Sequence, residues 1–353
     1  MFAAKHQGER QMIENNMRPF GANESYVASD AEPRSNNDSS HCAPGSKSPS
    51  AANATAQQNP PAPLLTTTDW GEEWKTLQSY RRKPDDPAYW NGRAHDFPAD
   101  TKVGPYAKRF LELADIKPGE TVFDMGCGTG ALALPLGLAG HKVVAADFSQ
   151  NMLDRMSDVM DAAGVKTVFP KLMSWDEDWT AKGVRTGMVD VCMASRSIAT
   201  ADMRDSLLRL TDVARRRVCI TLTTGSSPRT DERIIAELGL ADTLCRDYLY
   251  AINILANEGI LPQVDYIRST RFDTFADKQE AAASLQRMID SVASDPAAAG
   301  KREAATKRLD AWLSDNLIEN ETAGEPDVHG FPQKSYRLAK PRVITWAFIA
   351  WDK

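Results

Sequence analysis

The fold is decided by the stretch Glu-Thr-Val-Phe-Asp-Met-Gly-Cys-Gly-Thr-Gly, residues 120–130. An apolar strand over 121–123 runs into Asp124, and a turn rich in glycine follows. Glycine is needed where the backbone takes a positive φ or where a ligand lies against bare main chain. A glycine-rich turn that leaves a strand and opens a helix is typical of the nucleotide-binding corner of an α/β sheet. The residues that we assign to this corner are Asp124, Gly126, Cys127, Gly128 and Gly130.

Asp124 distinguishes between the ligands that such a corner binds. A fixed carboxylate at this place would repel the two phosphates of a dinucleotide, which disfavours a nicotinamide-dependent dehydrogenase. The same carboxylate suits a ligand that carries an ammonium group and no phosphate. S-adenosylmethionine has this character, because it combines adenosine, an amino acid and a sulfonium cation. We therefore predict S-adenosylmethionine as the cofactor.

The next acid along the chain is spaced for a ribose. Residues 141–147 read as a second strand that ends in Asp147. This acid stands about 20 residues after Asp124, the separation at which an acid accepts hydrogen bonds from ribose hydroxyls. Phe148 follows, and Ser149 then caps a new helix. We expect Asp147 and Phe148 beside the cofactor.

Strands and helices continue to alternate beyond this point. A third strand over 167–173 is followed by Trp175 and Asp176, where an aromatic face and a carboxylate would hold an adenine ring and its amino group. A fourth strand over 188–194 and a fifth over 218–223 flank a leucine-rich helix. Short apolar strands that alternate with helices predict a parallel, doubly wound α/β sheet.

The run from Val122 to Met156 resembles the core of the class I S-adenosylmethionine-dependent methyltransferases. Trp90-x-x-Arg93-Ala94 resembles a stretch ahead of the first motif in poorly characterised bacterial and archaeal members of small-molecule type. Asp124 and the three glycines match the first motif of the family, and Asp147 begins its Asp-x-Ser-x-x-Met-Leu continuation. The resemblance implies a mostly parallel, seven-stranded, Rossmann-like sheet. It also implies an antiparallel edge pair formed by the strands over 263–271 and 342–351, with Asp124 facing the methionine moiety.

Composition divides the chain into two expected parts. Residues 21–63 are dominated by small and polar side chains, which cannot bury enough apolar surface to offset the entropy of ordering. We expect a disordered extension over 1–65 and a methyltransferase domain over 66–353. The domain is expected to comprise an N-terminal helical lid (66–117), a core (118–276), a helical cap insertion (277–335) and the last strand (336–353). The lid aromatics either roof the cofactor or pin a helix to the core; they are Trp70, Trp74, Tyr89, Trp90 and Phe97.

Charge and cysteine usage argue against several other classes. The net charge of −6 argues against a broad nucleic-acid surface, although 81–83 and 215–217 are short basic runs. Five scattered cysteines without a Cys-x-x-Cys pair indicate neither a disulfide framework nor a zinc site, and they suit a reducing compartment. Neither a secretory leader nor an apolar run long enough to span a membrane is recognised. We expect a cytoplasmic protein without metal, membrane or nucleic-acid partner, whose oligomeric state stays open.

The catalytic candidates are few. Methyl transfer requires alignment of the acceptor with the methyl carbon, and some acceptors also need a base. His95 precedes the glycine turn and His329 lies before the last strand; each also reads as a surface histidine. Ser195, Arg196 and Ser197 follow the fourth strand, whose end borders the methyl group in the family, and are expected to line the pocket. Of these, Ser195 is expected to bind the cofactor, and Arg196 is also a catalytic candidate. Arg196 there would bind an anionic acceptor or form a salt bridge to a local acid.

Other functions remain open at this stage. The fourth strand ends in Ala-Ser-Arg-Ser rather than Asn/Asp-Pro-Pro-Tyr/Phe, which weighs against methylation of adenine amines or glutamine amides. No Pro-Cys pair is present to serve a cytosine-C5 methyltransferase. The leading prediction is a methyltransferase for a small-molecule acceptor whose acceptor atom is undefined. An RNA methyltransferase is favoured only if the basic runs share a face with the pocket, and a closed pocket would favour a non-catalytic S-adenosylmethionine-binding regulator.

Overall fold

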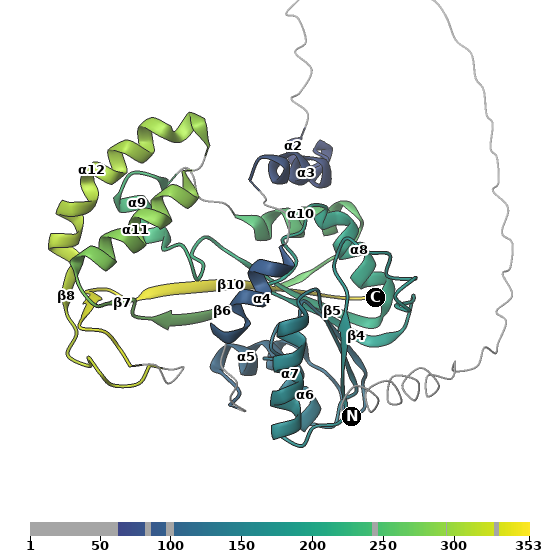
Figure 1. Cartoon of the computed structure of the whole chain (residues 1–353). Coiled ribbons are helices and arrows are strands. Elements are labelled where there is room, and N and C mark those ends of the chain that lie inside the picture. The colour runs from purple at the N-terminus through teal and green to yellow at the C-terminus, as the bar shows by residue number, and fades with distance from the viewer. Residues whose placement is uncertain (1–62, 82–85, 97–101, 242–245, 294, 328–331) are drawn as a thin grey trace, which may run out of the picture. The chain divides into compact units, whose positions relative to one another are not determined.

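The computed structural model describes residues 63–81, 86–96, 102–241, 246–293, 295–327 and 332–353. Within these ranges a seven-stranded sheet runs in the order β3-β2-β1-β4-β5-β10-β6 (Figure 1). Strands β1 to β5 are parallel, and β10 is antiparallel to both β5 and β6. The predicted doubly wound, mostly parallel sheet is therefore confirmed. Its strands are β1 (Val122–Met125), β2 (Val143–Asp147), β3 (Val168–Leu172), β4 (Val189–Ser195), β5 (Ala214–Thr223), β6 (Gln263–Arg271) and β10 (Arg342–Asp352).

Helices cover both faces of the sheet (Figure 1). The first face packs against α3, α8 and α10, and the second against α5, α6 and α7. Successive strand residues point to opposite faces, and in β1 Phe123 accordingly joins the first core cluster while Val122 joins the second. The helices are α3 (Trp70–Arg81), α8 (Met203–Val213) and α10 (Asp247–Asn257) on one side, and α5 (Pro105–Ala114), α6 (Ala133–Leu138) and α7 (Gln150–Ala162) on the other.

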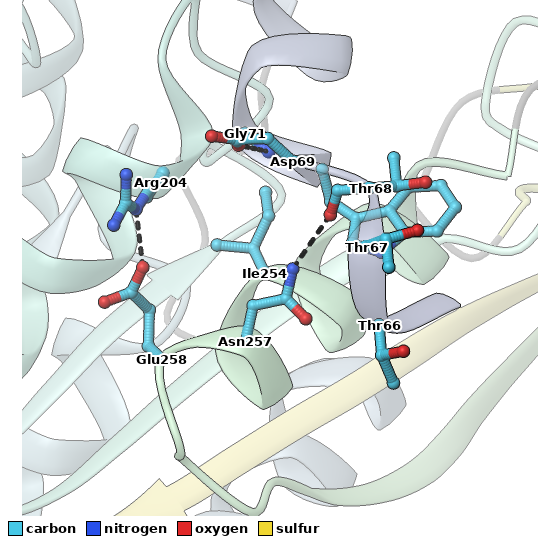
Figure 2. Close-up of a pocket in the computed structure, with 10 residues that line it drawn as sticks. Thr66, Thr67, Thr68, Asp69, Gly71, Arg204, Ile254, Asn257 and Glu258 are labelled. Atoms are coloured by element: carbon cyan, nitrogen blue, oxygen red, sulfur yellow. Dashed lines mark hydrogen bonds and ion pairs between the residues drawn. The ribbon is translucent and has the colours of Figure 1, made fainter. Parts of the chain in front are cut away.

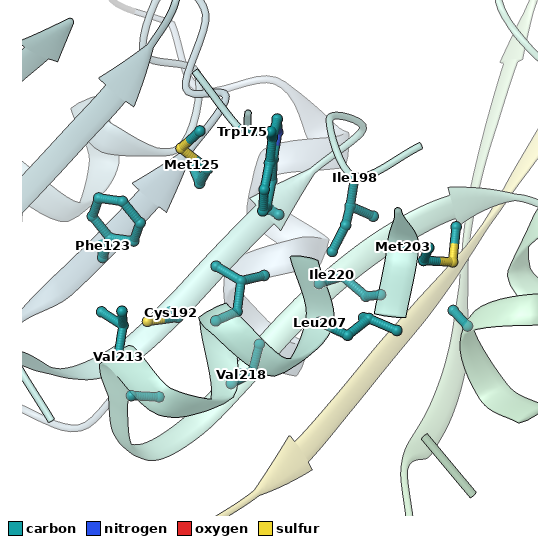
Figure 3. Close-up of a cluster of buried hydrophobic side chains, with 14 of the residues drawn as sticks. Phe123, Met125, Trp175, Cys192, Ile198, Met203, Leu207, Val213, Val218 and Ile220 are labelled. Atoms are coloured by element: carbon teal, nitrogen blue, oxygen red, sulfur yellow. The ribbon is translucent and has the colours of Figure 1, made fainter. Parts of the chain in front are cut away.

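The first core cluster ties the N-terminal helix to the sheet. Figure 3 shows its centre, where Phe123 and Met125 of β1 lie in one cluster with Leu207 of α8. Trp74 of α3 is fully buried in the same cluster, and its indole N–H donates a 2.8 Å hydrogen bond to the carbonyl oxygen of Thr200. Burying a tryptophan of this size stabilises the fold by about 2–3 kcal/mol. Trp74 therefore pins α3 to the core, one of the two roles considered for the lid aromatics.

A third cluster of buried side chains forms a separate helical unit, built from α9, which precedes β6, and from the chain between β6 and β10. Helices α11 and α12 pack on each other and on α9, with Leu285, Ile289 and Leu313 among their buried residues. Two helices were predicted in this part of the chain, but the small antiparallel sheet in the order β7-β9-β8 was not. Its elements are α9 (Glu232–Glu237), β7 (Thr274–Phe275), α11 (Lys278–Val292), α12 (Ala299–Asn316), β8 (Leu317–Glu319) and β9 (Tyr336–Leu338).

Another helix, α4 (Pro87–Arg93), is absent from the sequence prediction. Pro87 reads as a helix breaker, yet it occupies the first turn of α4, where a proline is tolerated because its N–H would have no partner. The carboxylate of Asp86 caps the helix by accepting a 2.8 Å hydrogen bond from the amide of Ala88. The extension expected over 1–65 lies outside the described residues except for 63–65, where helix α2 (Leu64–Thr67) already begins.

Candidate functional site

The candidate site lies where the order of the strands reverses. The chain passes from β1 to β2 and β3 on one side, and then returns to β4 and β5 on the other side of β1. In open α/β sheets, ligands bind at such a switch point, outside the carboxyl ends of the strands. The loops after β1 and β4 are joined here, because the Ser197 hydroxyl donates a 2.6 Å hydrogen bond to the carbonyl oxygen of Met125.

The three glycines after β1 meet different steric demands. A Cβ added to Gly126, whose φ is 78°, would lie 2.3 Å from the Cβ of Ser197. One added to Gly130 would lie 2.7 Å from the Cγ of Met156, so this glycine lets α7 approach the loop. Gly128, with a φ of 55°, differs. Its chain neighbours aside, no described heavy atom lies within 4 Å of a Cβ added to it. Its bare backbone therefore faces space that a ligand can fill.

Asp124 is the main electrostatic feature of the site. It lies within β1 and is only 2% exposed. Burial, and then the neighbouring charge of Asp147, raise the pKa of its carboxyl to about 7. Within the described ranges, its carboxylate has neither a hydrogen-bond donor nor a cation as a partner. Because a buried charge without a partner is costly, the residue fits a ligand that brings an ammonium group.

Asp147 joins the end of β2 to the glycine loop. Its two carboxylate oxygens accept hydrogen bonds of 2.9 Å from the backbone amides of Gly128 and Ser149. Asp147 thus lies against the backbone of the glycine loop, and its contact with ribose hydroxyls stays a prediction. Phe148, the other residue predicted at this strand end, is half-buried. The structure thus brings Asp124, Gly128 and Asp147 together.

Helix α4 extends along the carboxyl edge of the sheet. At one side, the amide oxygen of Asn91 accepts hydrogen bonds from the Ser149 hydroxyl at 2.7 Å and from the Asn151 backbone amide at 3.3 Å. At the other side, the Tyr89 hydroxyl accepts a 3.0 Å hydrogen bond from the guanidinium of Arg229, beyond β5. The helix therefore connects the end of β2 to the loop after β5. Sequence analysis did not single out Asn91, because its partners stand far along the chain.

Three other predicted site residues have different surroundings. Cys127 is buried with its sulfur 3.8 Å from that of Met156, and burial raises the pKa of its thiol well above the ordinary value. Trp175 is buried in the core with its ring centre 5.4 Å from that of Trp179 (Figure 3). Asp176 is exposed. Packing accounts for Cys127, and the adenine contacts of Trp175 and Asp176 stay predictions.

A cluster of hydroxyl groups and one arginine occupy the ends of β4 and β5. The Tyr106 hydroxyl is hydrogen-bonded to those of Ser195, at 2.8 Å, and Thr221, at 2.7 Å. Burial raises the pKa of Tyr106, so its hydroxyl is neutral at neutral pH. The guanidinium carbon of Arg196 lies 4.4 Å from the centre of the Tyr106 ring and 5.7 Å from that of Trp346. Sequence analysis found Ser195 and Arg196 but missed Tyr106, which has no local signal.

The two candidate bases are not brought together by the described structure. His95 is exposed in a 3-10 turn, Ala94–Asp96, directly after α4. His329 lies outside the described residues. A catalytic role for either histidine therefore stays a prediction.

The basic run 215–217 lies at the edge of the sheet opposite the site, because these residues begin β5 whereas Ser195 and Thr221 lie at the carboxyl ends of their strands. Its guanidinium groups are neutralised by carboxylates. The three ion pairs join Arg215 to Asp190, Arg216 to Glu120 and Arg217 to Asp352. Of the other basic run, Arg82 and Lys83 lie outside the described residues. Run 215–217 thus has a structural role.

A surface cavity of about 250 Å³ lies elsewhere, between the start of α3 and the helices α8 and α10. In Figure 2, Arg204 and Glu258 form an ion pair with a 2.5 Å separation at its wall. The side-chain amide of Asn257 donates a 3.0 Å hydrogen bond to the carbonyl oxygen of Thr68. Trp70, one of the lid aromatics, lines this cavity, but among the described residues none of the predicted glycine-loop, acidic or catalytic ones does. The cavity is therefore separate from the glycine-loop site.

Metal-binding clusters and membrane-spanning helices are both absent from the described residues. They contain no group of three or more His, Cys, Asp or Glu side chains placed to hold a metal ion. Across the same parts of the chain, no helix combines the length and apolar character that crossing a membrane requires. Neither absence assigns a partner to the site.

Comparison with known proteins places the chain in a family. Residues 122–216 match the family model of a methyltransferase domain. An uncharacterized protein of Haemophilus influenzae is 30% identical over 186 residues, which are 52% of this chain and 67% of that protein. Nocamycin O-methyltransferase of Saccharothrix syringae is 33% identical over 98 residues, 27% of this chain and 34% of that protein. A 23S rRNA (uracil-C5)-methyltransferase of Nitrosococcus oceani is 44% identical over 48 residues, 14% of this chain and 11% of that protein. With the glycine loop, the acids after β1 and β2 and the strand order, these findings establish that the chain belongs to the class I S-adenosylmethionine-dependent methyltransferases.

Proposed function

We propose that this protein transfers the methyl group of S-adenosylmethionine to a small-molecule acceptor. In this proposal Asp124 binds the ammonium group of the donor, the bare backbone at Gly128 lies against it, and Asp147 accepts its ribose hydroxyls. The buried carboxylate of Asp124, which lacks a cationic partner among the described residues, supports the assignment. A cationic ligand would relieve the cost of that buried charge.

The observation that carries the choice of a small acceptor is helix α4. It is fastened on one side by Asn91, which accepts from the Ser149 hydroxyl, and on the other side by Tyr89, which accepts from Arg229. A helix held on both sides over the carboxyl edge restricts the approach of a folded macromolecule. The paired arginines of 215–217 begin β5, at the opposite edge of the sheet, where they serve no nucleic acid bound at the site.

When bound, S-adenosylmethionine supplies a methyl carbon that an acceptor lone pair attacks in line, while the carbon–sulfur bond breaks and the sulfur keeps the electron pair. The side chains contribute positioning and the exclusion of water. Asp124 orients the amino-acid end, and α4 covers the edge. Tyr106 keeps its proton at neutral pH because its pKa is raised, so it fixes the Ser195 and Thr221 hydroxyls instead of acting as a base. For acceptors that lose a proton, His95 and His329 stay the candidate bases.

Two measurements test the proposal. Calorimetric titration with S-adenosylmethionine, S-adenosylhomocysteine and NADH should give heat with the first two ligands alone. Incubation of the protein and a methyl-labelled donor with a metabolite extract, and separately with total RNA, should label a species in the small-molecule fraction. Labelling of RNA alone, with an affinity that falls steeply with salt, would replace the small acceptor by RNA.

The same experiment addresses a non-catalytic regulator. A regulator would bind the donor with full stoichiometry and label neither fraction. The titration separates that outcome from a failed donor site. A regulator should give heat with the donor, and Asp124→Asn should abolish that heat, whereas a failed donor site gives no heat in the unsubstituted protein. Binding of NADH without binding of the methyl donor would refute the whole assignment.

A further inference from the structure

Arg196 has a strained backbone at the carboxyl end of β4. Its φ is 62°, in the left-handed region that residues other than glycine rarely adopt. Its backbone amide donates a 3.1 Å hydrogen bond to the hydroxyl of Thr221, and Ser197 next to it is bonded to Met125. The conformation is therefore imposed from both sides. Strain of this kind costs about 1–3 kcal/mol and gathers at ligand-binding sites.

Aromatic rings, rather than a carboxylate, hold the guanidinium of Arg196. The group is exposed and lies over Tyr106 and Trp346 at 4.4 and 5.7 Å from the ring centres. Over the chain segments that the structure describes, it forms neither an ion pair nor a hydrogen bond. The salt bridge that sequence analysis offered as the alternative is thus absent there. Stacking leaves the N–H edge of a guanidinium available to a planar or tetrahedral anion.

Two other arginines near this edge of the sheet are paired with acids. Arg342, at the start of β10, is paired with Asp273 at 2.5 Å, and Arg246 is paired with Glu232 at 2.8 Å. Carboxylates thus neutralise both of these guanidinium groups. Arg196 departs from that pattern although it stands beside the glycine loop.

The position of Arg196 identifies the side of the site it serves. Asp147 lies at the end of β2, on one side of β1, whereas Arg196 follows β4 on the other side and lies against Trp346 of β10. If the donor ribose is bound at Asp147 and its ammonium group at Asp124, the space beyond the ends of β4 and β5 is left for the acceptor. The guanidinium then borders the space that an acceptor occupies.

We propose that Arg196 binds an anionic group of the methyl acceptor, a carboxylate or a phosphate, through paired hydrogen bonds from its guanidinium. This inference rests on the proposed methyl-transfer function. It makes Arg196 a specificity-determining residue and selects acidic small molecules as the acceptor class. Neutral molecules that lack the anion are expected to be poor acceptors.

Anion binding is measured first, because it needs no identified acceptor. The full-length protein is saturated with S-adenosylhomocysteine and titrated with acetate and with inorganic phosphate, which separate the two anion types. One of them should bind to the unsubstituted protein about 10- to 100-fold more tightly than to Arg196→Gln, with Arg196→Lys between. Arg204→Gln is the matched control, since it removes an exposed arginine at the remote cavity and should leave anion binding unchanged.

The transfer assay then provides a second readout. Species labelled by the unsubstituted protein should be retained on an anion-exchange column, and Arg196→Gln should raise their KM more than it lowers kcat. Equal anion affinity in both proteins, or labelled species that are neutral, would overturn the assignment of Arg196. So would weaker binding of S-adenosylhomocysteine to Arg196→Gln, because Arg196 would then serve the donor carboxylate. If the unsubstituted protein labels nothing yet binds the anion through Arg196, the proposed transfer fails while the anion site stands.

Discussion

Replacing Asp124 by asparagine should make the ligand-free protein more stable at neutral pH and abolish binding of the methyl donor. Burial and Asp147 raise the pKa of this carboxyl from 3.8 to about 7. A shift of about 3 pH units corresponds to about 4 kcal/mol of folding free energy at about 1.4 kcal/mol per unit. That figure is the cost of keeping the carboxylate ionised in the folded protein.

The sign follows from the raised pKa. A folded-state pKa above the unfolded value means that Asp124 favours folding while it is protonated, below about pH 4. This contribution is lost as the pH rises from 3.8 to about 7. The substitution Asp124→Asn removes the titration. The free energy of unfolding of the variant, relative to that of the unsubstituted protein, should therefore rise by about 1.4 kcal/mol per pH unit across this window. Above the window the difference should stay constant.

Urea unfolding of both proteins at intervals from pH 4.5 to 8 measures the difference. A difference that stays constant over this range would show that Asp124 is not a buried, unpaired acid. Asp190→Asn is a control of opposite sign: although burial acts to raise its pKa, hydrogen bonds from Arg215 and Thr121 lower it to about 2. Asp190 stabilises the fold above pH 3.8, so its replacement should cost about 2 kcal/mol at neutral pH. This deficit should stay nearly constant from pH 4.5 to 8, because Asp190 is ionised in both the folded and the unfolded protein above its ordinary pKa of 3.8.

Donor binding gives the second half of the same test. The ionised form of Asp124 is the one that binds an ammonium group, so the affinity for S-adenosylmethionine should fall about tenfold per pH unit below pH 7. Asp124→Asn should show no calorimetric binding at any pH. Tight binding by the variant would refute the role of this carboxylate.

The remaining predictions concern the loops and the covering helix. Gly128→Ala should cost about 1 kcal/mol of stability through its positive φ and should abolish donor binding. Gly126→Ala should destabilise the protein further, because its methyl group would overlap Ser197. Identical behaviour of the two variants in urea unfolding and calorimetry would contradict this. Asn91→Ala should speed hydrogen exchange in α4 and weaken donor binding several-fold, with global stability changed by about 1 kcal/mol or less; unchanged exchange would show that α4 is held elsewhere. Tyr106→Phe should keep the ring yet lose about 1–2 kcal/mol of stability with the two hydroxyl contacts, and an unaltered unfolding curve would contradict that.

The sequence predicted the central sheet because several of its strands can be recognised from the local sequence alone. Strands β1, β2 and β4 each contain a short apolar run followed by an acid or a serine, at Asp124, Asp147 and Ser195. Such a run can be recognised without knowledge of distant residues. The strands β7, β8 and β9 escaped prediction since two or three residues carry no periodicity. Pro87 misled in the other direction, because a proline can begin a helix as well as end one.

In the candidate site too, residues of one local motif were predicted from the sequence, and a contact between distant residues was missed. Asp124, Gly128 and Asp147 belong to one motif, and the structure joins them as the motif implies. Tyr106 was missed because its partner Ser195 stands 89 residues away, a distance over which a single sequence gives no signal. Trp175 is predicted to face the adenine ring and also belongs to the buried cluster, so its ligand contact stays a prediction. Apolar side chains that border a site also build the core, and only packing distinguishes the two roles.

The helical unit has a hydrophobic core of its own. Two stretches of the chain contribute to this core: α9, before β6, and the segment from β7 to β9, between β6 and β10. The two strands that flank the longer stretch remain paired to each other along nine residues, from Arg342 opposite Arg271 to Ala350 opposite Gln263. A segment inserted between two strands that remain hydrogen-bonded to each other can be replaced without disturbing their pairing. A change in the length or sequence of this segment can thus leave the nine-residue pairing of β6 and β10 intact.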